Sequence, residues 1–244
     1  DRFSFRDLIF NVGLRVDRFD ANTKVLKDPY SLYSIRSAGE VDGSQNSING
    51  GAHPDNIGSN YAVYVDDFSD PKSANIIGYR NGDKWYDAKG VELSDPSVLA
   101  KLSATNTISP FLSNPKDKIT DSLFDPTTSF KDYDPQITIM PRISFSFPIN
   151  DGQALFFAHY DVLAQRPQSR SYITPDDYLY FENIVVDATL NNPNLKPEKT
   201  IDYQIGFQQE VSKTAALKLS TFYREYKDMI QVMRVVQAYP KSYR

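Results

Sequence analysis

The sequence predicts an all-β protein: a portion of an antiparallel transmembrane β-barrel with about five long strands. Apolar and polar residues alternate with period two over segments long enough for a tilted membrane strand, which needs roughly 9 to 11 residues. Long loops and tight turns alternate between successive strands, as in barrels with short periplasmic turns and long extracellular loops. The mean hydropathy of -0.48 and the lack of an apolar run of about 18 residues exclude a membrane helix but not a barrel, because alternation hides the hydrophobicity of its strands.

The first predicted strand covers about 5–17. Its apolar side chains fall on one face, and the other face carries polar residues or glycine from Asn11 onward. A strand with one apolar and one polar face suits a wall between lipid and an aqueous interior. The residues before it, Asp1 to Arg6, are interpreted as a charged entry to the same strand, and no signal peptide is recognised. The apolar positions are Leu8, Phe10, Val12, Leu14 and Val16.

A long connection, 19–136, follows the first strand and is predicted to be an extracellular loop. Because so long a segment is rarely structureless in a folded protein, it should contain elements of its own. Asn81-Gly82 predicts a small hairpin, and Ser94 to Leu102 predicts a short helix, since a capping residue precedes Pro96. Between Ser44 and Asn60 the chain is rich in Gly, Asn and Ser, and mobility is expected there.

The second and third predicted strands cover about 137–149 and 153–162. The tight turn Asn150-Asp151-Gly152 joins them, which predicts a hairpin. Pro141 lies inside the second strand, and because proline has no N–H, it predicts a bulge or a missing ladder bond. The third strand has a less polar second face, which carries His159.

A second long connection, 163–198, leads to the fourth and fifth predicted strands and is also expected to be an extracellular loop. The fourth strand runs from Lys199 to Val211, and the fifth ends near Tyr226 after a tight turn at 212–214. One face of the fourth strand is apolar and the other is almost wholly polar. The apolar face carries Ile201, Tyr203, Ile205 and Phe207.

The turn before the fourth strand carries a resemblance to a known family. Asn-Pro favours the start of a turn, and Pro197 biases Lys196 towards an extended conformation, which starts the strand. Followed by Tyr203 to Phe207, this turn resembles the "NPxLKPE" segment of TonB-dependent outer-membrane receptors. The residues are Asn192, Pro193, Asn194, Leu195, Lys196, Pro197 and Glu198.

Further segments are similar to barrel and loop segments of that family, and most resemble its branch with an added carboxypeptidase-regulatory-like domain at the N-terminus. They are Phe10 to Asp17, Pro141 to Pro148, and Trp85 to Asp87 with Asp95 to Leu99. The resemblance implies that 1–244 is part of a barrel of about 22 strands. No plug domain is found, and five tilted strands cannot close a barrel, so the chain is expected to be a barrel fragment.

The resemblance also implies a function. Such a receptor takes up a nutrient ligand, a glycan, a peptide or a metal chelate, by energised active transport across the outer membrane of a Gram-negative bacterium. The implied partners are outer-membrane lipid and the TonB complex, reached through the absent plug region. A surface-exposed substrate-binding lipoprotein is a further candidate partner.

The composition argues against several other classes of protein. The net charge of -4 and the lack of a basic run argue against nucleic-acid binding. With no cysteine, the chain has neither a disulfide framework nor a zinc-thiolate site, and no cofactor is implied. His159, Asp161 and a serine could form a catalytic set, but no G-x-S-x-G context supports one, so the chain is predicted not to be an enzyme. His53 is expected to be a loop residue.

The candidate ligand contacts lie in the two long loops. Aromatic and charged side chains at a receptor mouth can stack on, or hydrogen-bond to, a sugar or a peptide. The loop carboxylates Asp66, Asp67 and Asp70 are weak candidates for a calcium site; their spacing does not match an EF-hand, so no metal is predicted. The ligand candidates are Trp85, Arg166, Arg170, Tyr172, Asp176, Asp177, Tyr178 and Tyr180.

Two alternatives stay open. An outer-membrane barrel hydrolase would need His, Asp and Ser side chains that converge at the loop rim. A soluble β-rich binding module would pack its apolar faces against each other. The exposure of the apolar face of the fourth strand distinguishes a barrel wall from such a module.

Overall fold

The computed structural model describes residues 1–5, 7–149, 153–166 and 194–240, which divide into two compact units. The sheet unit takes 1–22, 133–166 and 194–231, and the loop unit takes 23–132 and 232–240. The predicted all-β class is confirmed, since the paired strands are antiparallel and the two α-helices of the described residues are short. No helix in these ranges is long and apolar enough to cross a membrane.

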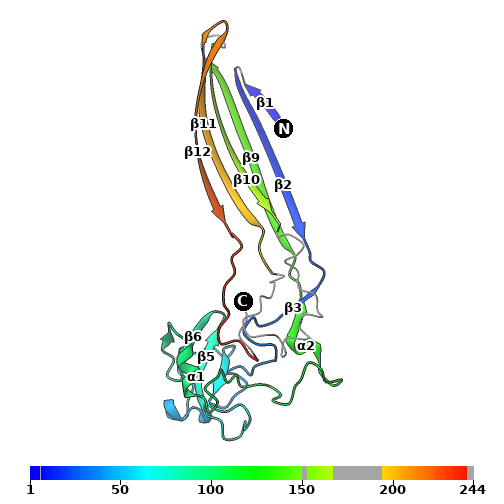
Figure 1. Ribbon diagram of the computed structural model, residues 1–244, viewed down its shortest axis with the longest axis vertical. Helices are drawn as coiled ribbons and strands as arrows, with labels where there is room; N and C mark the ends of the chain where they lie inside the picture. Colours follow the sequence, from blue (N-terminus) through cyan, green and yellow to red (C-terminus); the bar gives the residue numbers. More distant parts are fainter. Residues whose placement is uncertain (6, 150–152, 167–193, 241–244) are drawn as a thin grey trace. The chain divides into compact units, whose positions relative to one another are not determined.

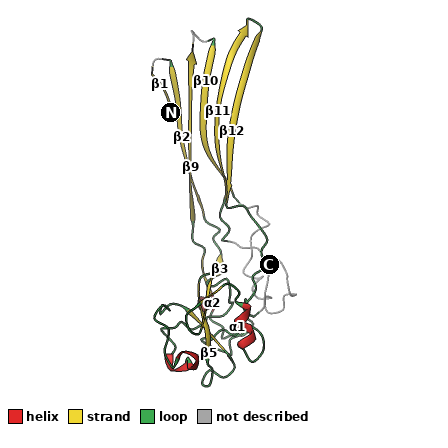
Figure 2. Ribbon diagram, turned by 90° about the vertical axis from the view of Figure 1, so that its left-hand side faces the viewer, coloured by secondary structure: helices red, strands yellow, loops and turns green. Residues whose placement is uncertain are grey.

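The sheet unit is one antiparallel sheet of six strands. The five longest strands have between 12 and 15 residues, whereas strands of soluble domains have about 5–6. The sheet is open in the described residues, with its first and last strands at the two edges (Figure 2). In spatial order, as Figure 1 shows, the strands are β1 (Arg2–Phe5), β2 (Leu8–Phe19), β9 (Gln136–Ile149), β10 (Ala154–Gln165), β11 (Glu198–Ser212) and β12 (Ala215–Lys227).

The five predicted long strands are confirmed as β2, β9, β10, β11 and β12, and the sheet has a short sixth strand in addition. Residues interpreted as an entry to the first strand form a separate strand, β1, which pairs antiparallel with β2 and places Phe5 opposite Leu8. The sequence did not reveal β1 because four residues are too few for a period-two pattern to be recognised.

Pro141 marks the point where two neighbouring strands part. β9 pairs with β2 as far as Gln136, but with β10 only from Ile149 to Arg142, the residue after Pro141. A proline has no N–H to give to a neighbouring strand. The missing ladder bond expected at Pro141 therefore coincides with the end of the β9–β10 ladder.

The two faces of the sheet differ in chemistry. On one face, Val12, Ile143, Tyr160, Tyr203 and Tyr223 are successive cross-strand partners from β2 to β12. Large apolar side chains on this face are exposed, and the buried hydrophobic residues of the protein lie mostly in the loop unit. Of the four residues expected on the apolar face of β11, Ile201 is half-buried, and the other three are exposed, with 43% for Tyr203, 51% for Ile205 and 39% for Phe207. This exposure favours a barrel wall over a sandwich of two packed sheets.

The loop unit has its own sheet and core, as its length required. Four strands pair in the order β4 (Ala62–Val65), β5 (Ile76–Asn81), β6 (Lys84–Asp87) and β7 (Glu92–Leu93). A second, two-stranded sheet joins β3 (Lys24–Leu26) to β8 (Phe130–Asp132). The helices are α1 (Ser97–Leu102), α2 (Pro126–Ser129), and the 3-10 turns η1 (Gly43–Gln45) and η2 (Ser47–Asn49). The core side chains include Val63, Tyr64, Ile76, Tyr79, Leu99 and Phe111.

The predicted elements of the loop unit are confirmed with small shifts. The hairpin is β5–β6, but Asn81 pairs with Lys84, so the turn is Gly82-Asp83, one residue later than expected; Gly82 has a φ of 57°. The helix is α1, which begins at Ser97, after Asp95 accepts a hydrogen bond from the Ser97 N–H.

The Gly/Asn/Ser-rich stretch, where mobility was expected, is built around a buried side chain. It carries η1, η2 and, between them, Asn46. The buried amide of Asn46 donates to the Ala88 carbonyl at 2.7 Å and to the Tyr79 hydroxyl at 3.1 Å. Composition did not reveal this, because these two partners lie far along the chain.

The segment after β12 also belongs to the loop unit. The Tyr239 N–H donates to the Tyr30 carbonyl, and the Leu32 N–H donates to the Tyr239 carbonyl. The Tyr239 ring packs against Tyr33 and Phe68. Two segments from near opposite ends of the chain therefore share one core.

Candidate ligand site

A notch opens near the point where β9 and β10 part. Its volume is about 240 Å³, and it lies at the strand ends that lead into the two long connections. We name it the mouth notch. It is lined by Arg15, Val16, Asp17, Arg18 and Phe19 of β2, by Thr138 of β9, and by Ala164, Arg166 and Pro197.

The mouth notch has a positive balance of charge, with three guanidinium groups and one carboxylate in its lining. Arg15 holds Asp17 with two hydrogen bonds, Nε to Oδ1 at 2.8 Å and Nη2 to Oδ2 at 2.7 Å. Arg18 reaches Asp20, just outside the notch, at 3.2 Å. The Arg166 guanidinium lies 5.1 Å from the ring centre of Phe19, and within the described residues it forms no hydrogen bond or ion pair. It acts electrostatically on Asp17, but among the described residues it is the lining guanidinium whose N–H groups have no hydrogen-bond acceptor.

The signature turn borders this notch. The Gln136 side chain of β9 donates from Nε2 to the Asn194 and Leu195 carbonyls, each at 3.3 Å. Pro197 is buried and lines the notch, and Glu198 begins β11, as the expected strand start requires. The turn thus ties β11 to β9 where β10 no longer pairs with β9. Asn192 and Pro193 lie outside the described residues.

Of the predicted ligand contacts, two lie in the described part of the chain. Arg166 lines the mouth notch. Trp85 is only 3% exposed and packs on Tyr30 and Tyr64, which favours a structural role for its indole. The others fall outside the described residues; they are Arg170, Tyr172, Asp176, Asp177, Tyr178 and Tyr180.

The sequence reasoning missed Arg15, Asp17, Arg18 and Thr138, because it looked for ligand contacts in loops. A usable signal was present. Charged residues gather near the end of β2, where Arg15 on the polar face and Arg18 on the opposite face are each followed two positions later by an aspartate. Residues at alternate positions of a strand share one face, so such pairs form easily.

The polar face of the sheet carries a charged network instead of a catalytic set. Arg142 donates to Asp161 at 2.6 Å, and Arg224 donates to Asp202 at 3.1 Å. His159 Nε2 lies 4.0 Å from Asp202, and in the described part of the protein it has no hydrogen bond to a serine. Because Asp161 is engaged by Arg142, the hypothetical set of His159, Asp161 and serine is not assembled. The network offers hydrogen bonds to water or a polar ligand.

The remaining candidate residues are engaged within the loop unit. His53 Nε2 is 2.9 Å from the Val41 carbonyl and Nδ1 is 2.9 Å from the Tyr79 hydroxyl, so Nε2 donates and Nδ1 accepts. Asp66 accepts from the Asn75 N–H, Asp67 from Ser69, and Asp70 from Ser73. In the described ranges, no group of three His, Cys, Asp or Glu side chains is placed to hold a metal ion.

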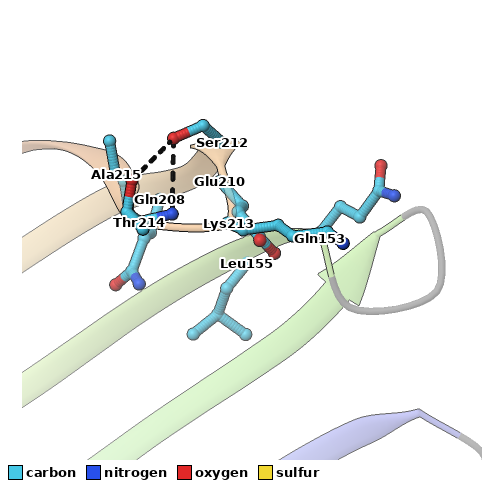
Figure 3. A pocket seen from close by; sticks show the side chains of 9 residues that line it. Gln153, Leu155, Gln208, Glu210, Ser212, Lys213, Thr214 and Ala215 are labelled. Carbon is cyan, nitrogen blue, oxygen red and sulfur yellow. Dashed lines mark hydrogen bonds between the residues drawn. The ribbon is translucent and has the colours of Figure 1, made fainter.

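A second cavity lies at the opposite end of the strands, beside the β11–β12 turn (Figure 3). Its volume is about 360 Å³, and Gln153, Leu155, Gln208 and Glu210 are among its lining residues. Ser212 closes the turn by accepting from the Thr214 N–H at 3.3 Å. The cavity is an open, polar hollow, whose lining carries one carboxylate, Glu210, and one ammonium group, Lys213.

Comparison with known proteins gives one result. A family model described as "TonB dependent receptor-like, beta-barrel" matches residues 1–242, nearly the whole chain. Neither the curated proteins nor the solved structures gave a match.

Proposed function

The chain belongs to the TonB-dependent receptor β-barrel family, and from this premise we propose that it forms part of the wall and mouth of an outer-membrane receptor that takes up a nutrient ligand by energised transport. The family consists of outer-membrane transporters, not enzymes. The nutrient would be a glycan, a peptide or a metal chelate.

One observation carries the proposal: the sheet has an exposed apolar face and a charged polar face. Cross-strand partners keep the two faces continuous from β2 to β12. Lipid requires an apolar outer surface, whereas the inside of a barrel is polar. The exposed Leu14, Ile205 and Leu219 would therefore face lipid, and Arg142, Asp202 and Arg224 would line the interior.

The arrangement of connections supports an orientation. The tight β11–β12 turn would lie on the periplasmic side, and the connections predicted at 19–136 and 163–198 would lie outside the cell. Further strands of the same barrel would pair with the edges of β1 and β12, because unpaired edges invite association. The TonB complex would act through a plug domain outside these 244 residues, and a surface lipoprotein could deliver the ligand.

Spin labels on neighbouring residues test the assignment of the two faces. The 244 residues contain no cysteine, so single cysteines at Ile205 and Gln204 of β11 can be labelled selectively. In the membrane-embedded receptor, we expect oxygen, which concentrates in lipid, to relax the label at Ile205. A water-soluble nickel chelate should instead relax the label at Gln204. Leu219→Cys and Ser220→Cys provide the same comparison on β12.

Two results would overturn the proposal. If the labels at Ile205 and Leu219 are shielded from both reagents, the apolar face packs against protein, as in a soluble module. If the nickel chelate reaches all four labels equally, the sheet does not separate lipid from water.

A further inference from the structure

We propose that the mouth notch binds one oxyanion group of the transported ligand, a carboxylate or a phosphate, with Arg166 as the principal donor. The inference rests on the receptor function proposed above and adds the chemical class of the group that is recognised. It follows from the free guanidinium, the charge balance and the size of the notch.

Arg166 is positioned to donate. Its guanidinium lies 5.1 Å from the ring centre of Phe19, and such contacts orient the planar group while leaving the N–H groups at its edge available. Within the described residues no carboxylate or carbonyl accepts from these N–H groups. A planar fork of N–H donors matches a carboxylate or a phosphate, with which it forms two parallel hydrogen bonds.

Arg15 adds to the anion affinity of the notch, although its own guanidinium is paired with Asp17. Its Nε and Nη2 hold Asp17, which leaves the two N–H groups of Nη1 unassigned. The pairing also neutralises the carboxylate that would otherwise repel an anion. Arg18 is paired with Asp20 in the same way, so Arg166 supplies the positive charge that remains in excess, next to strand ends that lead into the long connections.

The volume of the notch limits what it can hold. Pockets that enclose a whole small molecule have volumes of about 300–1,000 Å³, and this notch has about 240 Å³. It is therefore large enough for one functional group and too small for a whole oligosaccharide or peptide. Val16, Ala164 and Pro197 offer apolar contact to the atoms next to the anion.

Protection of arginines from phenylglyoxal tests the inference without knowledge of the ligand. The full receptor in zwitterionic lipid nanodiscs is treated with the reagent, and modification at each arginine is followed by peptide mass spectrometry. The probes are inorganic phosphate and acetate, each compared with sodium chloride at equal ionic strength. For a Kd of about 1 mM and a probe at about 10 mM, the rate at Arg166 should fall roughly tenfold.

Arg36 is the internal control. Its guanidinium also lies over a ring, 4.9 Å from the centre of Phe111, but in the loop unit. Its modification rate should not change. Equal protection of Arg36 and Arg166, or no protection of Arg166 by either probe, would overturn the inference.

Nanodiscs with anionic lipid distinguish a lipid headgroup from a free ligand. If Arg166 is protected by anionic lipid but by neither soluble probe, the site binds a headgroup and the inference about the ligand is wrong. Asp17→Asn provides a second measurement. Releasing Arg15 from its partner should lower the phosphate concentration needed for half protection of Arg166, and an increase would contradict the role given to Arg15. The spin-label test does not depend on these residues, so either proposal can fail alone.

Discussion

Arg80 shows how one buried charge holds the loop unit together. Its guanidinium is 5% exposed and pairs with Asp28, whose side chain is 27% exposed. Arg80 Nε donates to the Tyr64 hydroxyl at 2.8 Å, and the guanidinium lies 4.8 Å from the ring centre of Tyr30. Arg80, which belongs to β5, thus links Asp28 and Tyr30, which precede the four-stranded sheet, to Tyr64 of β4. Burial raises the pKa of the Tyr64 hydroxyl, so this phenol stays neutral and accepts the bond.

Replacing Arg80 should strongly destabilise the loop unit. Arg80→Met leaves the partly buried Asp28 and the buried Tyr64 hydroxyl without their partner, and leaving buried polar groups unpaired costs about 1–3 kcal/mol each. Lys84→Met is the matched control, because the Lys84–Glu92 pair is exposed and such pairs contribute about 1 kcal/mol or less. The free energy of unfolding can be followed in urea through fluorescence of Trp85, the one tryptophan of the chain. Similar losses for the two variants would contradict this interpretation.

Gly206 explains a second residue-scale feature, in β11. A Cβ at this position would lie 2.2 Å from Cζ of Phe157 on the neighbouring strand, so the ring occupies the space that a side chain would fill. The Lys218 ammonium lies 4.9 Å from the ring centre and borders it as well. A glycine inside a strand often marks such a close approach.

Gly206→Ala should therefore lower the stability of the sheet by roughly 1–3 kcal/mol, the usual cost of overpacking. In the double variant with Phe157→Ala, the added methyl group gains room, so the two costs should not add. Thermal unfolding followed by far-ultraviolet circular dichroism measures the stability of the single variants and of the double variant. Additive costs would show that the ring does not limit this position.

At the scale of elements, the long strands were predictable and their exceptions had local causes. Period-two alternation located all five long strands, because apolar residues recur at alternate positions of each strand over about a dozen residues. It did not locate β1, which is too short, or the mouth notch, which depends on where the β9–β10 ladder ends. The sequence did predict that Pro141 interrupts the pairing of its strand. It could not predict the lining of the mouth notch, because those residues come from three strands and a turn.

The short helices and turns of the loop unit depend on aspartates that accept N–H groups at their starts. The pKa of Asp42 is lowered by the Ser44 N–H. The pKa values of Asp95 and Asp125 are lowered by the hydroxyl and N–H groups of Ser97 and Thr127. Each of these carboxylates prefers to be charged in the folded state.

The stability of the loop unit should consequently fall in acid. Because the folded pKa values lie below the ordinary value of 3.8, the unfolded chain binds protons first as the pH falls. The contribution of these carboxylates to the free energy of unfolding is complete above their unfolded-state pKa. It is lost as the pH falls through their folded-state pKa values. Urea midpoints measured between about pH 5 and pH 2 should decrease. A triple variant with Asn at 42, 95 and 125 keeps a side-chain acceptor at each position, but its urea midpoint should depend less on pH. An unchanged pH dependence would exclude these carboxylates as the cause.

At the scale of the whole molecule, the sequence predicted which residues form the wall but not how the loop unit is closed. The strands, the hairpin and the helix follow from local patterns. The contact of Tyr239 with Tyr30 and Leu32 joins residues that no local pattern relates. Asn46 escaped the sequence analysis for the same reason, since its partners in the loop unit lie beyond any short window.

Removing the Tyr239 ring should loosen the segment 232–240. Tyr239→Ala deletes the contacts with Tyr33 and Phe68, and local opening that becomes easier by about 1.4 kcal/mol raises the open population tenfold. Trypsin cleavage after Arg234 should then be about tenfold faster. Tyr226→Ala, at an exposed site on β12, is the control and should leave the rate unchanged. Equal rates in the wild type and Tyr239→Ala would show that the ring does not hold the segment.

The shared core of Tyr30 and Tyr239 also has a consequence for the order of assembly. The hairpins β1–β2, β9–β10 and β11–β12 pair neighbouring segments, so their loop-closure entropy is small and they can form early. The loop unit cannot complete its core until residues that follow β12 have been synthesised. Through this non-local contact, the long connection between β2 and β9 reaches its final structure later than these hairpins.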